Sequence, residues 1–475
     1  MKRSHLWWAV LSAALAFAAL PLLLERLAEP PAELRLRTAD FGETVDSDRM
    51  RTRTLPHRWQ VDCPDCRTVW YRFDVSLPDL PRETQAIYLP AVGENAGIYL
   101  NGRLLGQGGR FADPAARLGR QPLWVAAPSA TWVAGSNVLY VLVKAERPGA
   151  GLMPAPVVGP ESALAAASRL RQALAATLPQ MFATASVVLA LMAAALAYYR
   201  RQEPVYVALA LASIAFAANA FTSLVIEPPV AGRLWDAWLV LSAWLVTLTS
   251  LLLALRLAAA GRIGRVAMPV VTVAAVVAAA MAGLAPALLT VDDNLALGRA
   301  VLVLVGLGLA ARGWRDSNGG VLWAGVVLAL LSLVDLLRLP AQPEALPAQP
   351  WAMAALLGAA GWLSIVRFVD TLNAAELLNV DLEAMVRQRT AALETQFERV
   401  RELERRQTIA AERERLMRDM HDGVGGHLVS MLAMIEADRR RPGELAVVVR
   451  DALDDMRLMI DSLDPVDDDL NAVLA

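Results

Sequence analysis

The chain has 475 residues, of which 56% are hydrophobic, and its mean hydropathy is +0.41. This composition is too apolar for an ordinary soluble domain and predicts a membrane protein with soluble parts. The formal net charge of −2 excludes the global positive field that favours direct binding of nucleic acids.

Residues 1–24 are predicted to form an N-terminal transmembrane helix. The apolar run from Leu6 to Leu24 is about nineteen residues long, which suits the bilayer core better than the shorter apolar region of a signal peptide. A cleaved signal peptide is the alternative, because alanine-rich sequence precedes Glu25. Lys2 and Arg3 predict a cytoplasmic N-terminus.

Residues 25–170 predict an extracytoplasmic β-sandwich that would serve as the sensor domain. Apolar and polar residues alternate from Trp70 to Leu77, as in a half-buried strand, and Asn101-Gly102 is a tight-turn signal. Further strands are predicted at 87–89, 96–100 and 138–143. In this order the strands resemble a galactose-binding-like jelly roll. The resemblance makes a carbohydrate or another small molecule a candidate ligand, and a pure scaffold is the alternative. Trp124 and Trp132 are either stacking platforms for a sugar or core aromatics.

The two cysteines, Cys63 and Cys66, are a disulfide candidate if this domain is extracytoplasmic. No histidine follows Cys66, which argues against a c-type haem site. A metal or redox role is disfavoured because no other cysteine or nearby histidine cluster completes a site, so no metal is predicted.

Residues 175–370 predict a seven-helix transmembrane domain. The apolar runs cover 178–199, 204–224, 234–258, 266–288, 294–312, 320–339 and 350–369, each about long enough to span a bilayer. Basic residues recur at alternate ends, at Arg200-Arg201, Arg262, Arg265, Arg312, Arg315 and Arg367. These ends are therefore predicted to be cytoplasmic. With the first helix this gives eight spans and a multi-pass protein of the bacterial inner membrane, in contact with lipid and with both termini in the cytoplasm.

Three ionisable residues, Arg299, Asp335 and Arg338, lie within or beside these runs. One interpretation is that they reach toward the membrane surface from helix ends. The alternative is a buried interaction between Asp335 and an arginine.

Residues 371–411 predict a signalling coiled coil. The segment lacks proline, and an apolar seam runs through Leu382, Val386, Leu393, Val400, Leu403 and Ala410. Spacings of three, four and seven suit a parallel coiled coil of two copies, and therefore a homodimer.

Residues 412–465 predict a helical hairpin. On the first helix, one apolar stripe is formed by Met417, Met420, Val424, Leu428, Met431 and Ile435. At about 100° per residue, His421 lies at the edge of this stripe and Asp422 points to solvent. After a turn at Pro442-Gly443, a three-four repeat from Leu445 to Leu463 predicts the second helix. Two such hairpins would form a dimeric four-helix bundle.

The first helix resembles the phosphoacceptor box of sensor histidine kinases, in the nitrate-sensor and DesK-like branch, the third dimerisation-and-acceptor subfamily. The matching residues are Glu412, Arg413, Arg415, Leu416, Arg418, Asp419, Met420, His421, Asp422, Gly425 and Leu428. One position departs, because Gly426 stands where the family usually has Gln. The β-domain followed by seven spans is similar to the 7TMR-DISM receptors.

The resemblance implies a two-component sensor kinase that is phosphorylated on His421, with Asp422 as orienter or general base. Its partners would be a second copy and a response regulator, usually a helix-turn-helix DNA-binding protein in this branch. Gly426 and His427 are the positions related to phosphatase activity. The complete kinase uses ATP and Mg²⁺.

No ATP-binding motif is recognised in the sequence, and residues 466–475 are interpreted as a linker to an absent ATP-binding domain. The expectation is therefore that this chain binds no ATP and is inactive alone. A non-enzymatic receptor or dimerisation scaffold is the alternative function.

Overall fold

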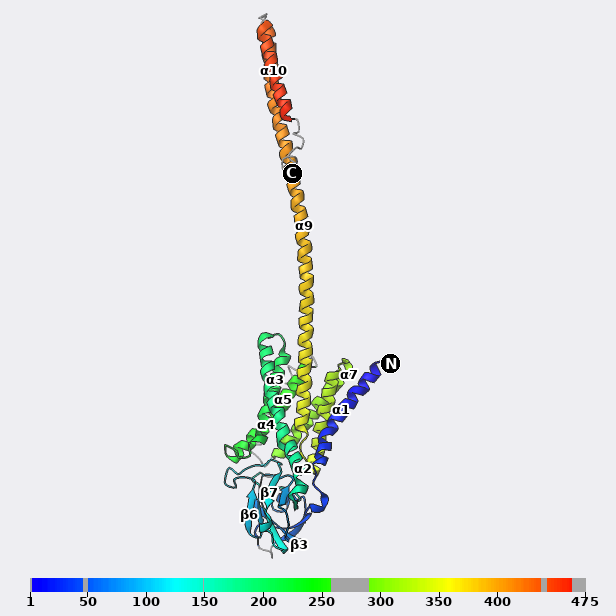
Figure 1. Cartoon of the computed structure of the whole chain (residues 1–475), viewed down its shortest axis with the longest axis vertical. Helices are drawn as coiled ribbons and strands as arrows, with labels where there is room; N and C mark the ends of the chain where they lie inside the picture. Colours follow the sequence, from blue (N-terminus) through cyan, green and yellow to red (C-terminus); the bar gives the residue numbers. More distant parts are fainter. Residues whose placement is uncertain (1, 46–49, 148, 258–289, 437–441, 464–475) are drawn as a thin grey trace. The chain divides into compact units, whose positions relative to one another are not determined.

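The computed structural model describes residues 2–45, 50–147, 149–257, 290–436 and 442–463. It divides into two compact units, Met1–Val369 and Asp370–Ala475. The first unit holds a β-domain and a group of long apolar helices, and the second is helical (Figure 1).

The β-domain contains two antiparallel sheets. Its strands are β1 Thr38–Gly42, β2 Arg51–Thr54, β3 Thr68–Leu77, β4 Gln85–Leu89, β5 Asn95–Leu100, β6 Arg103–Gln107, β7 Leu123–Ala127, β8 Gly135–Lys144 and β9 Val157–Pro160. The larger sheet has the order β2-β1-β3-β8-β5-β6, and the smaller has the order β7-β4-β9. This is the predicted sandwich-like arrangement, and the four predicted strands correspond to β3, β4, β5 and β8.

The central pair β3 and β8 explains why the sandwich forms. Burial alternates along both strands, so Tyr71 and Phe73 point into the core opposite Val141 and Leu139. Such period-two burial lets one face of the sheet remove its apolar surface from water. The predicted turn joins β5 to β6, where Asn101 and Gly102 have φ angles of 51° and 80°, a backbone region that these two residue types tolerate.

Seven helices among the described residues are long and apolar enough to cross a membrane. They are α1 Lys2–Leu27, a continuous segment from α2 Glu161–Gln172 to α3 Leu178–Tyr199, α4 Pro204–Leu224, α5 Gly232–Leu257, α7 Val291–Arg315, α8 Gly319–Ala341 and α9 Gln349–Glu436. The predicted span at 266–288 lies outside the described residues.

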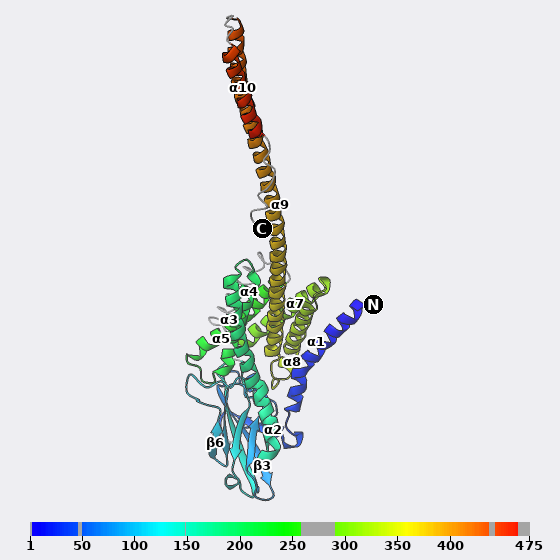
Figure 2. The same cartoon turned by 45° about the horizontal axis from the view of Figure 1, so that its top comes forward.

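α2 runs beside the sheets, where Leu164 packs with Tyr88 and Val157 (Figures 1 and 2).

Small residues bring α7 and α8 close together. A Cβ atom added to Gly306 would lie 2.5 Å from the backbone nitrogen of Ala329 and 2.7 Å from the carbonyl oxygen of Gly325. Only glycine permits such backbone approach, a packing mode common between membrane helices.

Asp335 is not directed away from the helices to the membrane surface, as one interpretation of the sequence expected. Its side chain is buried and accepts hydrogen bonds from the backbone N–H groups of Ala348, at 2.7 Å, and Gln349, at 2.8 Å. It thereby satisfies donors at the start of α9. Arg338 instead pairs with Glu25 of α1, at 2.8 Å.

The β-domain is joined to the helix ends by buried polar contacts. Arg117 pairs with Asp236 of α5, and its backbone N–H donates to the carbonyl of Ile226 at 2.7 Å. Gln121 donates to the carbonyl of Ser223 at 2.8 Å, after which α4 ends. Glu344, before α9, accepts a hydrogen bond from the backbone N–H of Ala155 at 2.8 Å.

In the second unit, α9 continues to Glu436 and is followed by α10, Pro442–Leu463. Residues 373–411 of α9 are exposed on every side in the single chain. The predicted coiled-coil seam belongs to this surface, with 62% of Val386 and 50% of Val400 exposed. These apolar side chains therefore have no covering element among the described residues of one chain.

Candidate functional site

His421 and Asp422 lie on the fully accessible part of α9. Their side chains are 87% and 88% exposed. His421 Nδ1 is 3.7 Å from Asp422 Oδ1, which is longer than a hydrogen bond. In this conformation no hydrogen bond joins Asp422 to the imidazole.

The predicted apolar stripe of the acceptor helix is divided in the single chain. Met420, Val424 and Met431 are half-buried, whereas Met417, Leu428 and Ile435 are 56%, 58% and 63% exposed. In a single hairpin only α10 covers α9, whereas in a four-helix bundle the helices of a second hairpin would cover more of its surface. The single hairpin thus covers one part of the predicted stripe, and burial of the whole stripe in a dimeric bundle stays a prediction.

The face turned toward α10 includes the half-buried Leu416, Met420 and His427 of α9. On α10, Ala452 is buried and Met456 is half-buried. His427 Nε2 lies 3.1 Å from Asp455 Oδ2, so His427 takes part in contacts within the hairpin. Asp455 was not singled out from the sequence, because nothing local pairs residues 28 positions apart.

Gly425 and Gly426, two of the three glycines that follow Asp422, lie beside open space on the helix surface. A Cβ atom added at Gly425 or Gly426 would meet no described atom within 4 Å. Glycine costs a helix about 1 kcal/mol relative to alanine, and no close approach within the described hairpin explains the cost.

The cysteines of the β-domain form a disulfide between Cys63 and Cys66, with a Cα–Cα distance of 5.4 Å. Glu43 lies beside it, so that three atoms of metal-ligating types come within 4.8 Å of one another. Metals bind the thiolate form of cysteine, and a disulfide sulfur does not offer it. The disulfide is a covalent cross-link within the loop that precedes β3.

The two tryptophans considered as sugar platforms differ in their surroundings. Trp132 is buried in the sandwich core and donates from Nε1 to the carbonyl of Ala127 at 3.3 Å. Trp124 is half-buried and lines an open cavity of about 450 Å³ beside α2, together with Tyr88 and Arg169. Of these two tryptophans, only Trp124 therefore borders an open cavity.

No model of a known protein family matches this chain, and no curated protein matches it. Among solved structures, the β-D-glucuronidase of Dictyoglomus thermophilum is 17% identical over 23% of this chain and 19% of that enzyme, with a TM-score of 0.20. An uncultured Clostridium β-glucuronidase is 19% identical over 24% of this chain and 23% of its own, with a TM-score of 0.19.

A glycosyl hydrolase family 2 member from Bacteroides cellulosilyticus is 20% identical over 26% of this chain and 20% of its own, with a TM-score of 0.21. The chain thus spans less than a quarter of these three structures. At such TM-scores the likeness carries no conclusion about the fold or the function of this chain.

Proposed function

We propose that this chain is the receptor and phosphoacceptor part of a transmembrane sensor histidine kinase. In this proposal His421 is phosphorylated and passes the phosphoryl group to a response regulator of a two-component system. The observation that carries it is the position of the acceptor box. The box lies on α9, the same unbroken helix whose first part is apolar enough to cross a membrane.

The exposure of His421 suits the proposed chemistry. A neutral imidazole nitrogen attacks the γ-phosphorus of ATP in line, and the bond to the leaving ADP oxygen breaks. The proton on the other ring nitrogen is stabilised by the nearby negative charge of Asp422. ATP and Mg²⁺ supply the phosphoryl group and neutralise its charge. The residues that hold them belong, in this proposal, to a separate ATP-binding domain that must reach an open histidine.

The uncovered apolar side chains support a homodimer. Leu428, Leu432 and Ile435 of α9 are more than half exposed, and Leu453 on α10 is 50% exposed. A second hairpin would cover them, as a second α9 would cover the seam of the coiled coil. The test of the complete proposal is phosphorylation of the full chain in trans, argued in the Discussion.

The proposed location is the bacterial inner membrane, with the β-domain outside and His421 inside. A reporter that is active only outside the cytoplasm should therefore be active when fused after Gly151 and silent when fused after Arg201. The charge pattern of the loops gives this expectation. Matched fusions of a reporter active only in the cytoplasm should give the opposite result. Cytoplasmic activity at Gly151 would contradict the proposed topology.

Replacing Gly426 by Gln should increase the dephosphorylation of the partner regulator. In the family that the acceptor box resembles, a Gln at this position acts with the Asp four positions before it, here Asp422. Together they are thought to orient a water molecule against the phospho-aspartate of the regulator. Gly426 has open space for the longer side chain, and Gln also favours the helix more than Gly does. The measurement is the rate of phosphate loss from the purified regulator, with a several-fold increase expected.

The matched control is Gly425→Gln, which places the same amide about 100° away on the helix. It should leave the rate unchanged. A rapid rate for the unaltered chain that is lost in His427→Ala would show instead that His427 serves in place of the amide.

A further inference from the structure

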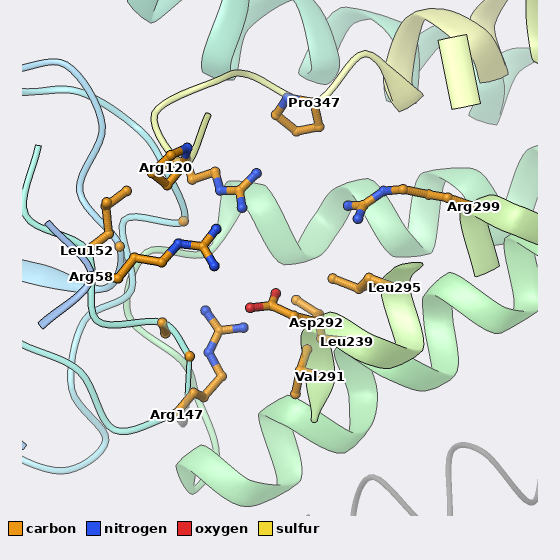
Figure 3. A pocket seen from close by; sticks show the side chains of 15 residues that line it. Arg58, Arg120, Arg147, Leu152, Leu239, Val291, Asp292, Leu295, Arg299 and Pro347 are labelled. Carbon is orange, nitrogen blue, oxygen red and sulfur yellow. The ribbon is translucent and has the colours of Figure 1, made fainter. Parts of the chain in front are cut away.

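A cavity of about 230 Å³ lies between the β-domain and the ends of α5 and α7. Its lining comes from β-domain loops, from Leu239 of α5, from α7 and from the segment before α9. Figure 3 shows the guanidinium groups of Arg58, Arg120, Arg147 and Arg299 pointing toward one space, with the carboxylate of Asp292 beside it. These residues come from four distant parts of the chain.

The four arginines differ in how far the protein satisfies them. Arg147 Nε pairs with Glu94 at 2.6 Å, and Arg58 Nη2 lies 3.4 Å from the carbonyl oxygens of Leu339 and Pro340. For Arg120 and Arg299, no side-chain hydrogen bond and no ion pair within 4.0 Å is present among the described residues. The Nε atom of Arg299 is buried without a partner.

Positive charge exceeds negative charge in this cavity. Arg147 is neutralised by Glu94, which leaves three guanidinium groups facing the single carboxylate of Asp292. The buried carboxylate of Asp335 also attracts Arg120 and Arg299, so three guanidinium groups share two carboxylates and one positive charge is in excess. A guanidinium cannot lose its charge at physiological pH, so the excess is compensated only by an added anion.

The backbone at Arg120 is also held in an uncommon conformation. Its φ angle is 72°, in the left-handed region, directly after Gly119 at 57°. This conformation costs free energy for any residue other than glycine, and residues held in it are more frequent at functional sites. Burial lowers the pKa of Arg120, with partial compensation by Asp292. Both the backbone conformation and the burial of Arg120 are therefore unfavourable for the stability of the fold.

We infer that this cavity is a binding site for a small anion that carries carboxylate or phosphate groups. Guanidinium groups bind both kinds of group through paired, charge-assisted hydrogen bonds. The volume is below the usual 300–1,000 Å³ of ligand pockets, which favours a small molecule. No aromatic residue is among the described lining residues, so the cavity offers a neutral sugar no stacking surface.

A bound anion would connect the two halves of the first unit. It would bridge Arg120 of the β-domain and Arg299 of α7, which otherwise repel each other across the cavity. If the proposed receptor function holds, this anion is the signal or part of it. Binding itself is independent of phosphoryl transfer, so it is measured without a kinase domain.

The test uses the full chain in nanodiscs of zwitterionic lipid, with citrate and inorganic phosphate as probes and galactose as the neutral control. Calorimetric titration should show binding of at least one anion, and that anion should raise the thermal unfolding midpoint. Arg120→Gln and Arg299→Gln should each weaken binding by about tenfold or more. The matched control Arg103→Gln removes one exposed arginine of the β-domain and should bind as the parent does.

The anion-free midpoints separate binding from a structural role. Removing an unpaired cation should leave the midpoint unchanged or raise it, whereas removing a structural partner would lower it. Nanodiscs containing phosphatidylglycerol form the second arm. Stabilisation by this lipid that is lost in Arg299→Gln would assign the phosphate to a lipid headgroup and support the site. Equal binding by the parent and both cavity variants, or stabilisation by neither soluble anions nor anionic lipid, would overturn the inference.

Discussion

Replacing His421 by Gln is expected to reduce phosphorylation of the chain to less than about one hundredth of the parent level. Glutamine keeps a polar side chain but has no nucleophilic ring nitrogen. The helix should tolerate the change, because the His421 side chain is 87% exposed and contacts solvent. The measurement is the incorporation of acid-labile, base-stable label into the full chain in nanodiscs, with ATP, Mg²⁺ and the catalytic domain of a related kinase.

The matched control is His427→Gln, six positions further along the same helix. His427 is 32% exposed and lies 3.1 Å from Asp455 within the hairpin, so it should remain unlabelled in the parent. This variant should keep most of the labelling, with any loss traceable to a weaker hairpin in circular dichroism. Labelling of His421→Gln at the parent level, with loss in His427→Gln, would show that the acceptor was assigned to the wrong histidine.

The main strands and the helix that carries His421 could be predicted because their signals are local. Period-two alternation identified β3, and Asn101-Gly102 identified the turn before β6. The box is contained in one helix, so spacing alone placed His421 and Asp422 on different sides of it. The hairpin face was harder to predict, since burial there depends on how much of α9 a single α10 covers.

The arginine cavity could not be predicted from the sequence. Arg58, Arg120, Arg147 and Arg299 lie 27 to 152 positions from the next arginine of the set along the chain, and only folding brings them to one space. Of the four, only Arg299 stands out in the sequence, because it lies in an apolar run. Asp335 shows the same limit: its charge was conspicuous, but its role at the start of α9 depends on a turn whose geometry no local pattern specifies.

The second large effect is expected at the junction of the β-domain and the helices, in a buried charge cluster around Arg117. Arg117 is 8% exposed and pairs with Asp236, while Glu94 and Glu146 lie 3.9 and 4.0 Å away. Arg147 and Lys144 are the other cations of the cluster, at 2.6 Å from Glu94 and 3.1 Å from Glu146. Three carboxylates thus share three cations.

Arg117→Ala should destabilise the first unit by about 3–5 kcal/mol, because it leaves an uncompensated carboxylate in a buried place. Arg103→Ala removes the same side chain from an exposed position and should change stability by less than about 0.5 kcal/mol. The measurement is equilibrium unfolding by denaturant in detergent micelles, followed by tryptophan fluorescence.

A double-mutant cycle with Asp236→Asn then tests whether the loss arises from the ion pair. Asparagine removes the charge that Arg117 leaves behind, so the double variant should be more stable than the sum of the two single losses predicts. The coupling should be smaller with Glu146→Gln, since Glu146 lies 4.0 Å from Arg117 and closer, at 3.1 Å, to Lys144. Asp236 instead bonds Arg117 directly and lies 3.6 Å from its second partner, Arg147. Additive losses for Arg117→Ala and Asp236→Asn would show that the Arg117 side chain stabilises the junction through its packing and not through its charge, because the backbone hydrogen bond to Ile226 is kept in both variants.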